Sequence, residues 1–192
     1  RRQLRLNPDD NLGVRMDLPL LLSCTGQATS AVKAMQRLVK PGARMDGHVL
    51  FILSMCSLLS VGLKEGLSYF LRALFEYPAL RPILKNEEEL PEIEGPEWIW
   101  HRGVMPDIDA LWFHYQTAIA YGADAAIEEV YLQILDRADV TLAEDEMAAL
   151  FKKIRADGHW NQNASQHWAA ECIRTANELG AKICEEWLSQ LE

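Results

Sequence analysis

The stretch from Gly66 to Pro78, which reads GLSYFLRALFEYP, constrains the fold of this chain more than any other feature. Residues three and four apart share one face of a helix, so Gly66, Phe70 and Ala73 are expected to be buried together. A small residue at position 66 lets a neighbouring helix approach closely, and Phe70 fills the space between the helices. Pro78 ends the helix because proline cannot continue its hydrogen-bond ladder. One such helix cannot bury its own apolar face, so the sequence predicts that it packs against stacked neighbours.

Composition narrows the kinds of partner that the chain can have. Its 192 residues, 49% of them hydrophobic, suit one compact domain or a short array of helical repeats. A net charge of −9 repels phosphate backbones, which argues against nucleic acid as a partner. The longest apolar run, Val49 to Leu63, is broken by serines and a glycine and falls short of the roughly 20 residues that cross a bilayer. No signal-peptide pattern is present either, so we expect no membrane contact.

The four cysteines point to a reducing environment. They lie far apart, form no C-x-x-C motif and sit in apolar helical surroundings, where cysteine acts as a small hydrophobic residue. We therefore expect a cytoplasmic location. The residues are Cys24, Cys56, Cys172 and Cys184.

The spacing of Gly66, Phe70, Ala73 and Pro78 resembles the A-x3-F-x2-A-x4-P half of a tetratricopeptide repeat (TPR), with glycine in the first alanine position. Residues 50–57 fall where that family carries its W-x2-L-G-x2-Y pattern, with serine at the small position and both aromatic residues lost. The resemblance implies an all-α fold of a divergent TPR-like type. It would be a short solenoid of helical hairpins in a right-handed superhelix, closed by a long C-terminal capping helix.

A second part of the resemblance lies near the start of the chain. Residues 6–15, LNPDDNLGVR, resemble the repeat boundary of a divergent branch of the same family, which implies that an earlier repeat precedes residue 1. The chain also begins with Arg1 instead of methionine, and Leu191-Glu192 has the form of a cloning scar. We therefore expect that the chain is a C-terminal piece of a longer protein.

The resemblance divides residues 1–192, taken as a single TPR-like helical domain, into three hairpins. The hairpins are expected at about residues 11–43, 45–84 and 107–139. Residues 85–106 form an irregular insertion that is rich in glutamate and proline and carries two tryptophans. We expect this insertion to tuck a tryptophan onto the helical stack; the alternative is a partner-binding or lid element.

Two further helices are expected over residues 142–190. Thr141 and Glu144 have the spacing of a capping box, which predicts a helix from Leu142 to Ala156. The last helix, from about Asn161, carries an apolar stripe at spacings of three and four. It is expected to cap the array, with its outer side exposed to solvent. The alternative is that its tryptophans form a homodimer contact. The stripe consists of Trp168, Cys172, Ala176, Leu179, Ile183 and Trp187.

The search for catalytic motifs is mostly negative. The sequence has no G-x-x-x-x-G-K-[ST], G-x-G-x-x-G, G-x-S-x-G or H-E-x-x-H pattern, so the chemistries of those motifs lose their usual support. His101, Asp107, Asp109 and His114 lie close together in sequence and could offer imidazole and carboxylate ligands to a metal. A simpler interpretation is that Asp107 caps a helix and His114 packs against a neighbour. We therefore expect no cofactor and no metal site, with an all-α metal-dependent hydrolase built on these residues as an alternative.

The resemblance also implies a binding surface. TPR arrays line a concave groove with the first helix of each repeat and bind a peptide or helix of another protein there. In this chain the groove would take an apolar or amphipathic segment. The same side chains also suit the core, and the last helix could itself fill the groove. The residues expected to line it are Leu12, Met16, Leu20, His48, Phe51, Met55, Leu59 and either Trp112 or Tyr115.

These observations favour a non-catalytic adaptor or scaffold domain that binds another protein or peptide. A further alternative is a helical immunity or regulatory protein that masks a basic partner through its acidic surface. Neither the residues nor the resemblance identify the partner.

Overall fold

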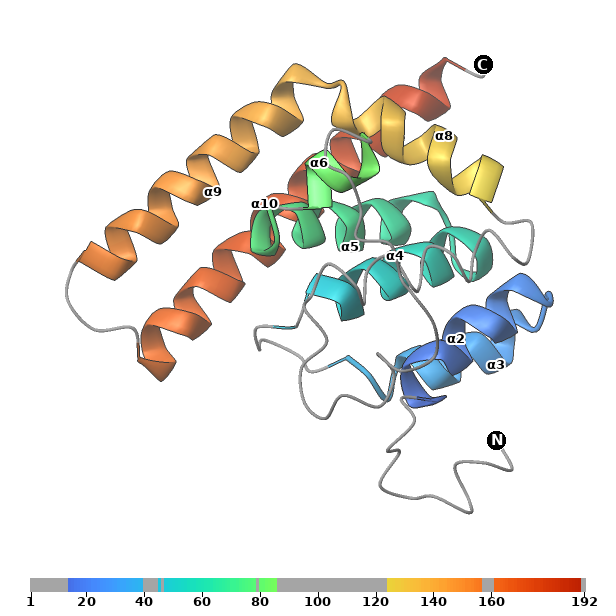
Figure 1. The fold of residues 1–192 in the computed structure, drawn as a ribbon. Coiled ribbons are helices and arrows are strands. Elements are labelled where there is room, and N and C mark those ends of the chain that lie inside the picture. Colours follow the sequence, from blue (N-terminus) through green and yellow to red (C-terminus); the bar gives the residue numbers. More distant parts are fainter. Residues whose placement is uncertain are drawn as a thin grey trace.

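The structure is a computed structural model of the chain and describes residues 14–39, 45, 47–78, 80–85, 124–156 and 161–190. Throughout this part the regular elements are α-helices and no strand occurs, as the all-α prediction requires (Figure 1). Over the same residues, no helix combines the length and the apolar character needed to span a lipid bilayer.

Two helical hairpins form the N-terminal half. Helices α2 (Val14–Cys24) and α3 (Ala28–Met35) are joined by a tight turn in which Gly26 has a φ of 71°, a conformation that favours glycine. Helices α4 (Gly47–Ser60) and α5 (Leu63–Glu76) form the second hairpin. Their residues fall inside the first two spans that the resemblance implies, 11–43 and 45–84.

The α4–α5 hairpin forms the centre of the core. Gly66, Phe70 and Ala73 are all buried, as their spacing predicts. A Cβ atom on Gly66 would lie 2.5 Å from Cδ2 of Leu58, so α4 approaches α5 more closely than an alanine would allow without displacing Leu58. At the same contact, the hydroxyl of Ser54 donates a hydrogen bond of 3.0 Å to the Gly66 carbonyl.

Helix α8 (Asp124–Leu135) joins this core through Tyr131. The Tyr131 ring stacks on Phe70 with a centroid distance of 3.9 Å and tilts against Phe51 at 5.5 Å. Its hydroxyl lies 2.7 Å from Oγ of Ser54. Because the single hydroxyl hydrogen of Ser54 already goes to the Gly66 carbonyl, Tyr131 is the donor in this contact.

The short helix α6 (Leu80–Leu84) is tied to two later helices by Arg81. The Arg81 guanidinium pairs with the Glu144 carboxylate on α9 (Ala138–Ala156), and its Nη1 donates to the Leu135 carbonyl at the end of α8. One arginine therefore holds α6, α8 and α9 together.

Helix α9 begins at Ala138, so the predicted start at Leu142 is wrong. The Thr141 hydroxyl donates to the Arg137 carbonyl at 3.3 Å, as it does in a helix that has already begun. Glu144 does not reach back to cap the helix, because it pairs with Arg81. The Thr-x-x-Glu spacing is therefore not a capping box here.

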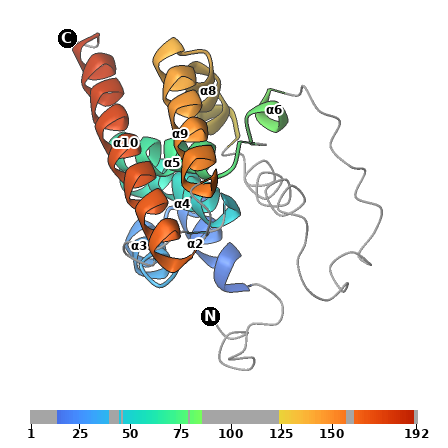
Figure 2. The ribbon, with the colours of Figure 1, turned by 90° about the vertical axis from the view of Figure 1, so that its left-hand side faces the viewer.

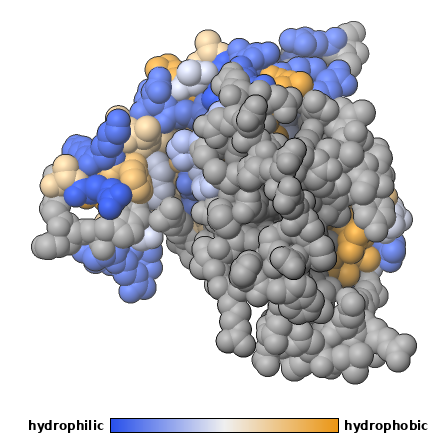
Figure 3. All heavy atoms as spheres, viewed as in Figure 1, coloured by the Kyte–Doolittle hydropathy of each residue, from blue (hydrophilic) through white to orange (hydrophobic). Residues whose placement is uncertain are grey.

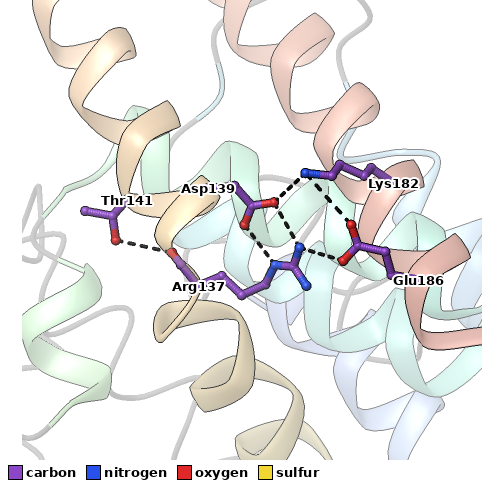
Figure 4. A network of polar contacts seen from close by, with 5 residues as sticks. All are labelled: Arg137, Asp139, Thr141, Lys182 and Glu186. Atoms are coloured by element: carbon purple, nitrogen blue, oxygen red, sulfur yellow. Dashed lines mark hydrogen bonds and ion pairs between the residues drawn. The ribbon is translucent and has the colours of Figure 1, made fainter. Parts of the chain in front are cut away.

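A charged network ties the turn between α8 and α9 to α10 (Gln162–Ser189) (Figure 4). Arg137 donates to both carboxylate oxygens of Asp139 at 2.9 Å and to Glu186 of α10 at 2.7 Å. Lys182 of α10 donates to Asp139 at 2.9 Å. Through these hydrogen bonds, first from Arg137 and then from Lys182, the pKa of the Asp139 carboxyl is held well below its usual range, although partial burial opposes the shift.

Helix α10 starts at a cap, where the Asn161 side chain accepts a hydrogen bond of 2.9 Å from the backbone N–H of Ala164. The apolar stripe that the sequence predicts faces inward along its length. Trp168, Cys172, Ala176 and Ile183 are buried, and Leu179 and Trp187 are half-buried against the same core. Glu178 and Glu185 lie on the exposed side.

Among the described helices, α10 packs chiefly on α5, and it also lies beside α9 (Figures 1 and 2). At the crossing with α5, a Cβ atom on Gly180 would lie 3.3 Å from the backbone nitrogen of Ser68, so a small residue is needed there. In a linear array the last helix contacts only the repeat before it. Here it instead closes over the second hairpin.

Candidate functional site

A groove of about 730 Å³ runs along the seam between α5 and α10. Its lining combines apolar side chains, hydroxyl and amide groups, and charges of both signs. From α5 it takes Lys64, Glu65, Ser68, Tyr69 and Arg72, from α10 Ile173, Ala176, Asn177, Glu178 and Ala181, and Val39 completes the wall.

The crossing of the two helices produces this groove. Gly180 brings α10 onto Ser68 of α5. The residues beside the crossing are larger and only partly covered: Tyr69 and Ile173 are half-buried, and Asn177 is exposed. They therefore line an opening next to the contact instead of filling it.

Besides Glu65, four polar side chains of the groove form no hydrogen bond or ion pair with any other residue that the structure describes. Because their hydrogen-bonding capacity is not used inside this part of the protein, it is available to solvent or to a ligand. They are Lys64, Ser68, Tyr69 and Asn177.

The electrostatics of the groove suit binding better than acid–base catalysis. Burial raises the pKa of the Tyr69 phenol above its usual range, the Glu65 carboxylate adds to the rise, and Arg72 opposes it. Tyr69 therefore stays protonated at neutral pH and acts as a donor, whereas a general base needs a pKa near the working pH. Arg72 is buried and pairs with Glu76 at 2.6 Å, so its charge is balanced inside the protein.

Three of the residues expected to line a groove on the first-helix side are buried in the core. Leu20, Phe51 and Met55 are at most 1% exposed, because α2 and α4 pack against each other and against their hairpin partners. They belong to the core, which is the alternative that the sequence left open, and Leu59 is half-buried against it. The other expected positions lie outside the described residues or side chains; they are Leu12, Met16, His48, Trp112 and Tyr115.

The residues of the alternative metal site, His101, Asp107, Asp109 and His114, also lie outside the described part of the chain. Within the part that is described, no three His, Cys, Asp or Glu side chains are grouped so that they could hold a metal ion.

The cysteines are free thiols in or near the core. Burial raises the pKa of the Cys56 thiol to about 12, although a hydrogen bond with Ser23 opposes the shift. Burial also raises the pKa of Cys24. Since the thiolate is the reactive form, these two cysteines behave as the small hydrophobic residues that the sequence predicts.

The α5–α10 groove could not be read from the sequence, because it depends on which helix α10 packs against. Only a weak signal was present. Gly180 is an isolated glycine in a long helical pattern, and such a glycine marks a close approach of another backbone. The sequence does not say that the approaching backbone is that of Ser68.

Comparison of the chain with protein-family models, with curated proteins and with solved structures finds no match. The TPR resemblance therefore stays a sequence-based expectation, and the assignment of function rests on the α5–α10 groove.

Proposed function

We propose that this chain is a non-catalytic protein-interaction domain and that the groove between α5 and α10 binds a short amphipathic segment of a partner protein. The observation that carries the proposal is the unused hydrogen-bonding capacity of Lys64, Ser68, Tyr69 and Asn177 around an opening of about 730 Å³. Sites of this kind combine apolar contact area with a few polar groups that fix the orientation of the ligand.

The lining determines the chemistry of the partner segment. Ile173 and the ring of Tyr69 offer apolar surface for one or two large side chains, which supply most of the affinity in such complexes. Lys64 and Glu65 carry opposite charges at the start of α5, and neither forms an ion pair within the described residues. A segment that carries both an acidic and a basic residue beside its apolar anchor therefore complements the groove better than a uniformly charged segment.

The proposal keeps the adaptor role that the TPR resemblance implies and moves the binding surface. In a TPR-like arrangement the first helices of the hairpins line the groove, but Leu20, Phe51 and Met55 of those helices lie in the core. The surface proposed here uses α5, the second helix of its hairpin, together with α10. A reducing, cytoplasmic setting belongs to the same proposal and is supported by the four free thiols.

A random peptide library displayed on phage tests the proposal. Peptides selected on the wild-type chain are expected to bind at least about tenfold more weakly to Asn177→Trp, because the indole fills the groove. Glu185→Trp is the matched control, since Glu185 is exposed on the same helix and does not line the groove. Affinities are measured by fluorescence anisotropy and folding by circular dichroism. Selection of no peptide, or equal binding of every selected peptide to both variants, would contradict the proposal.

A further inference from the structure

The outer side of α9 carries a stripe of exposed residues that differs from an ordinary solvated helix face. In Figure 1, α9 lies at the edge of the molecule, and in Figure 3 this edge mixes hydrophilic and hydrophobic spheres. Leu142 is 60% exposed on the stripe. The residues of the stripe are separated alternately by four and three positions, which is the spacing of a coiled-coil seam. The stripe consists of Ala138, Leu142, Asp145, Ala149, Lys152 and Ala156, all exposed.

Four charged residues are arranged around Ala149. Asp145 and Glu146 precede it, and Lys152 and Lys153 follow it. All four are exposed, and none forms a hydrogen bond or ion pair with another residue in the described part of the chain. Each acid is seven residues from the matching lysine, about two turns, so the two cannot pair within α9.

The helix dipole favours Lys153, which lies in the last turn of α9, but it does not account for the two acids. Its influence falls off within the first and last turns of a helix. Asp145 and Glu146 lie beyond the first turn of α9, which begins at Ala138. The two acids therefore gain little from the position that they occupy.

A two-fold axis at Ala149 satisfies all four charges. At about 100° per residue, Asp145 and Lys152 lie on one flank of the line through Ala149, and Glu146 and Lys153 lie on the other. Rotation about an axis perpendicular to the helix reverses its direction and leaves each flank facing the same flank of the copy. Asp145 then faces Lys152 of the second copy, Glu146 faces its Lys153, and symmetry repeats both contacts.

We propose that α9 is a homodimer interface in which the α9 helices of two copies pack antiparallel about a two-fold axis at Ala149. The occupant of this face is a second copy. When the helix direction is reversed about Ala149, each acid takes the place of a lysine, so the face is complementary in charge to itself, as an isologous contact requires. The small side chain at Ala149 lets the two backbones approach at the axis. No residue of α9 lines the α5–α10 groove, so the dimer leaves that groove open.

The energetics make this a weak, salt-sensitive dimer. Each exposed ion pair contributes little, and salt screens it. A contact between single helices belongs to the small, transient class of interfaces. Sedimentation equilibrium of the full chain over a concentration series is expected to show dimers at low ionic strength and an association constant that falls as sodium chloride is added.

Charge reversal tests which residues form the contact. Asp145→Lys or Lys152→Asp turns two attractive contacts of the dimer into two repulsive ones. Each variant is expected to lower the association constant at least about tenfold, which corresponds to about 1.4 kcal/mol. Glu185→Lys on α10 is the control; it reverses an exposed charge away from α9 and is expected to leave association unchanged.

Mixing the two variants gives the decisive result. Asp145→Lys carries lysine at both positions and Lys152→Asp carries aspartate at both, so each repels a copy of itself and complements the other variant. The mixture and the double variant Asp145→Lys/Lys152→Asp are both expected to recover dimers, with circular dichroism spectra like that of the wild type. A wild-type chain that stays monomeric at the highest concentration, association that either reversal leaves unchanged, or a mixture that stays monomeric overturns the proposal.

Discussion

Tyr131 joins α8 to the α4–α5 hairpin through ring contacts with Phe70 and Phe51 and through a hydrogen bond to Ser54. The substitution Tyr131→Phe keeps the ring and removes the hydrogen bond. It is expected to lower the free energy of unfolding by about 1 kcal/mol, the usual net value of one hydrogen bond. Tyr131→Ala also removes the ring and is expected to cost about 3–5 kcal/mol. Urea denaturation followed by circular dichroism measures both values; similar losses in the two variants would show that stacking contributes little.

Single residues were predicted well where a local spacing rule applies and poorly where it does not. The burial of Gly66, Phe70 and Ala73 follows from their positions on one helix. The hydrogen bond between Ser54 and Tyr131 joins residues 77 positions apart, and no spacing rule connects them. The burial of Leu20, Phe51 and Met55, which were expected in a groove, could not be predicted from spacing either. Apolar residues at such positions suit a core and a binding surface equally.

At the scale of helices, the network around Asp139 predicts a pH dependence of stability. The folded pKa of Asp139 lies below its unfolded value, so its pairing with Arg137 and Lys182 stabilises the fold above the unfolded pKa of about 4. This contribution to the free energy of unfolding is lost as the pH falls through the pKa that Asp139 has in the folded protein. Asp139→Asn is therefore expected to lower the free energy of unfolding by about 1 kcal/mol at neutral pH, a value kept small because the carboxyl is partly exposed to solvent.

The test is urea denaturation of the wild type and Asp139→Asn at neutral pH and at several values below about pH 4. The difference between the two chains is expected to shrink as the pH falls, since Asp139 becomes protonated in the wild type. Glu185→Gln serves as the control, because Glu185 is exposed and makes no ion pair within the described residues. A difference that is constant over the whole pH range would contradict the assigned role of the Asp139 carboxylate.

Helix positions were largely predictable, and the one clear error has a physical cause. The first two spans expected from the TPR resemblance contain α2 to α5, and the last helix was expected from about Asn161, which caps α10. The Thr141-x-x-Glu144 pattern misled because Thr141 bonds to the Arg137 carbonyl inside a helix that has already begun, and Glu144 pairs with a charged side chain. Glu144 meets the guanidinium of Arg81, 63 residues earlier in the chain, and such a pairing leaves no local sequence signal.

The order in which the helices stack belongs to the whole molecule and was not predictable from the chain. The apolar stripe of α10 indicated an inward face but did not indicate which helix that face meets. A repeat array would place α10 on the preceding hairpin, whereas among the helices that the structure describes it packs chiefly on α5. The candidate site follows from this packing, because the groove is lined by the uncovered parts of those two helices together with Val39.

The closure of α10 over α5 predicts how the chain responds to loss of that helix. Trp168, Cys172 and Ile183 of α10 lie in one core cluster with residues of α4, α5 and α9. Burial of each large apolar side chain contributes about 1.5–3 kcal/mol, against a total of about 5–15 kcal/mol for a domain. A chain that ends at Ala156 is therefore expected to lose cooperative unfolding and to show a gradual loss of helical signal in urea.

Ile183→Ala is the matched control for this truncation, because it keeps α10 and removes only part of one buried side chain. It is expected to lower the free energy of unfolding by about 2–5 kcal/mol while the transition stays cooperative. In a linear array, by contrast, removal of the last helix takes away one terminal increment and leaves the remaining repeats folded. A truncated chain with a sharp transition, and with helicity reduced only by the share of α10, would therefore favour the linear array and contradict the closed core.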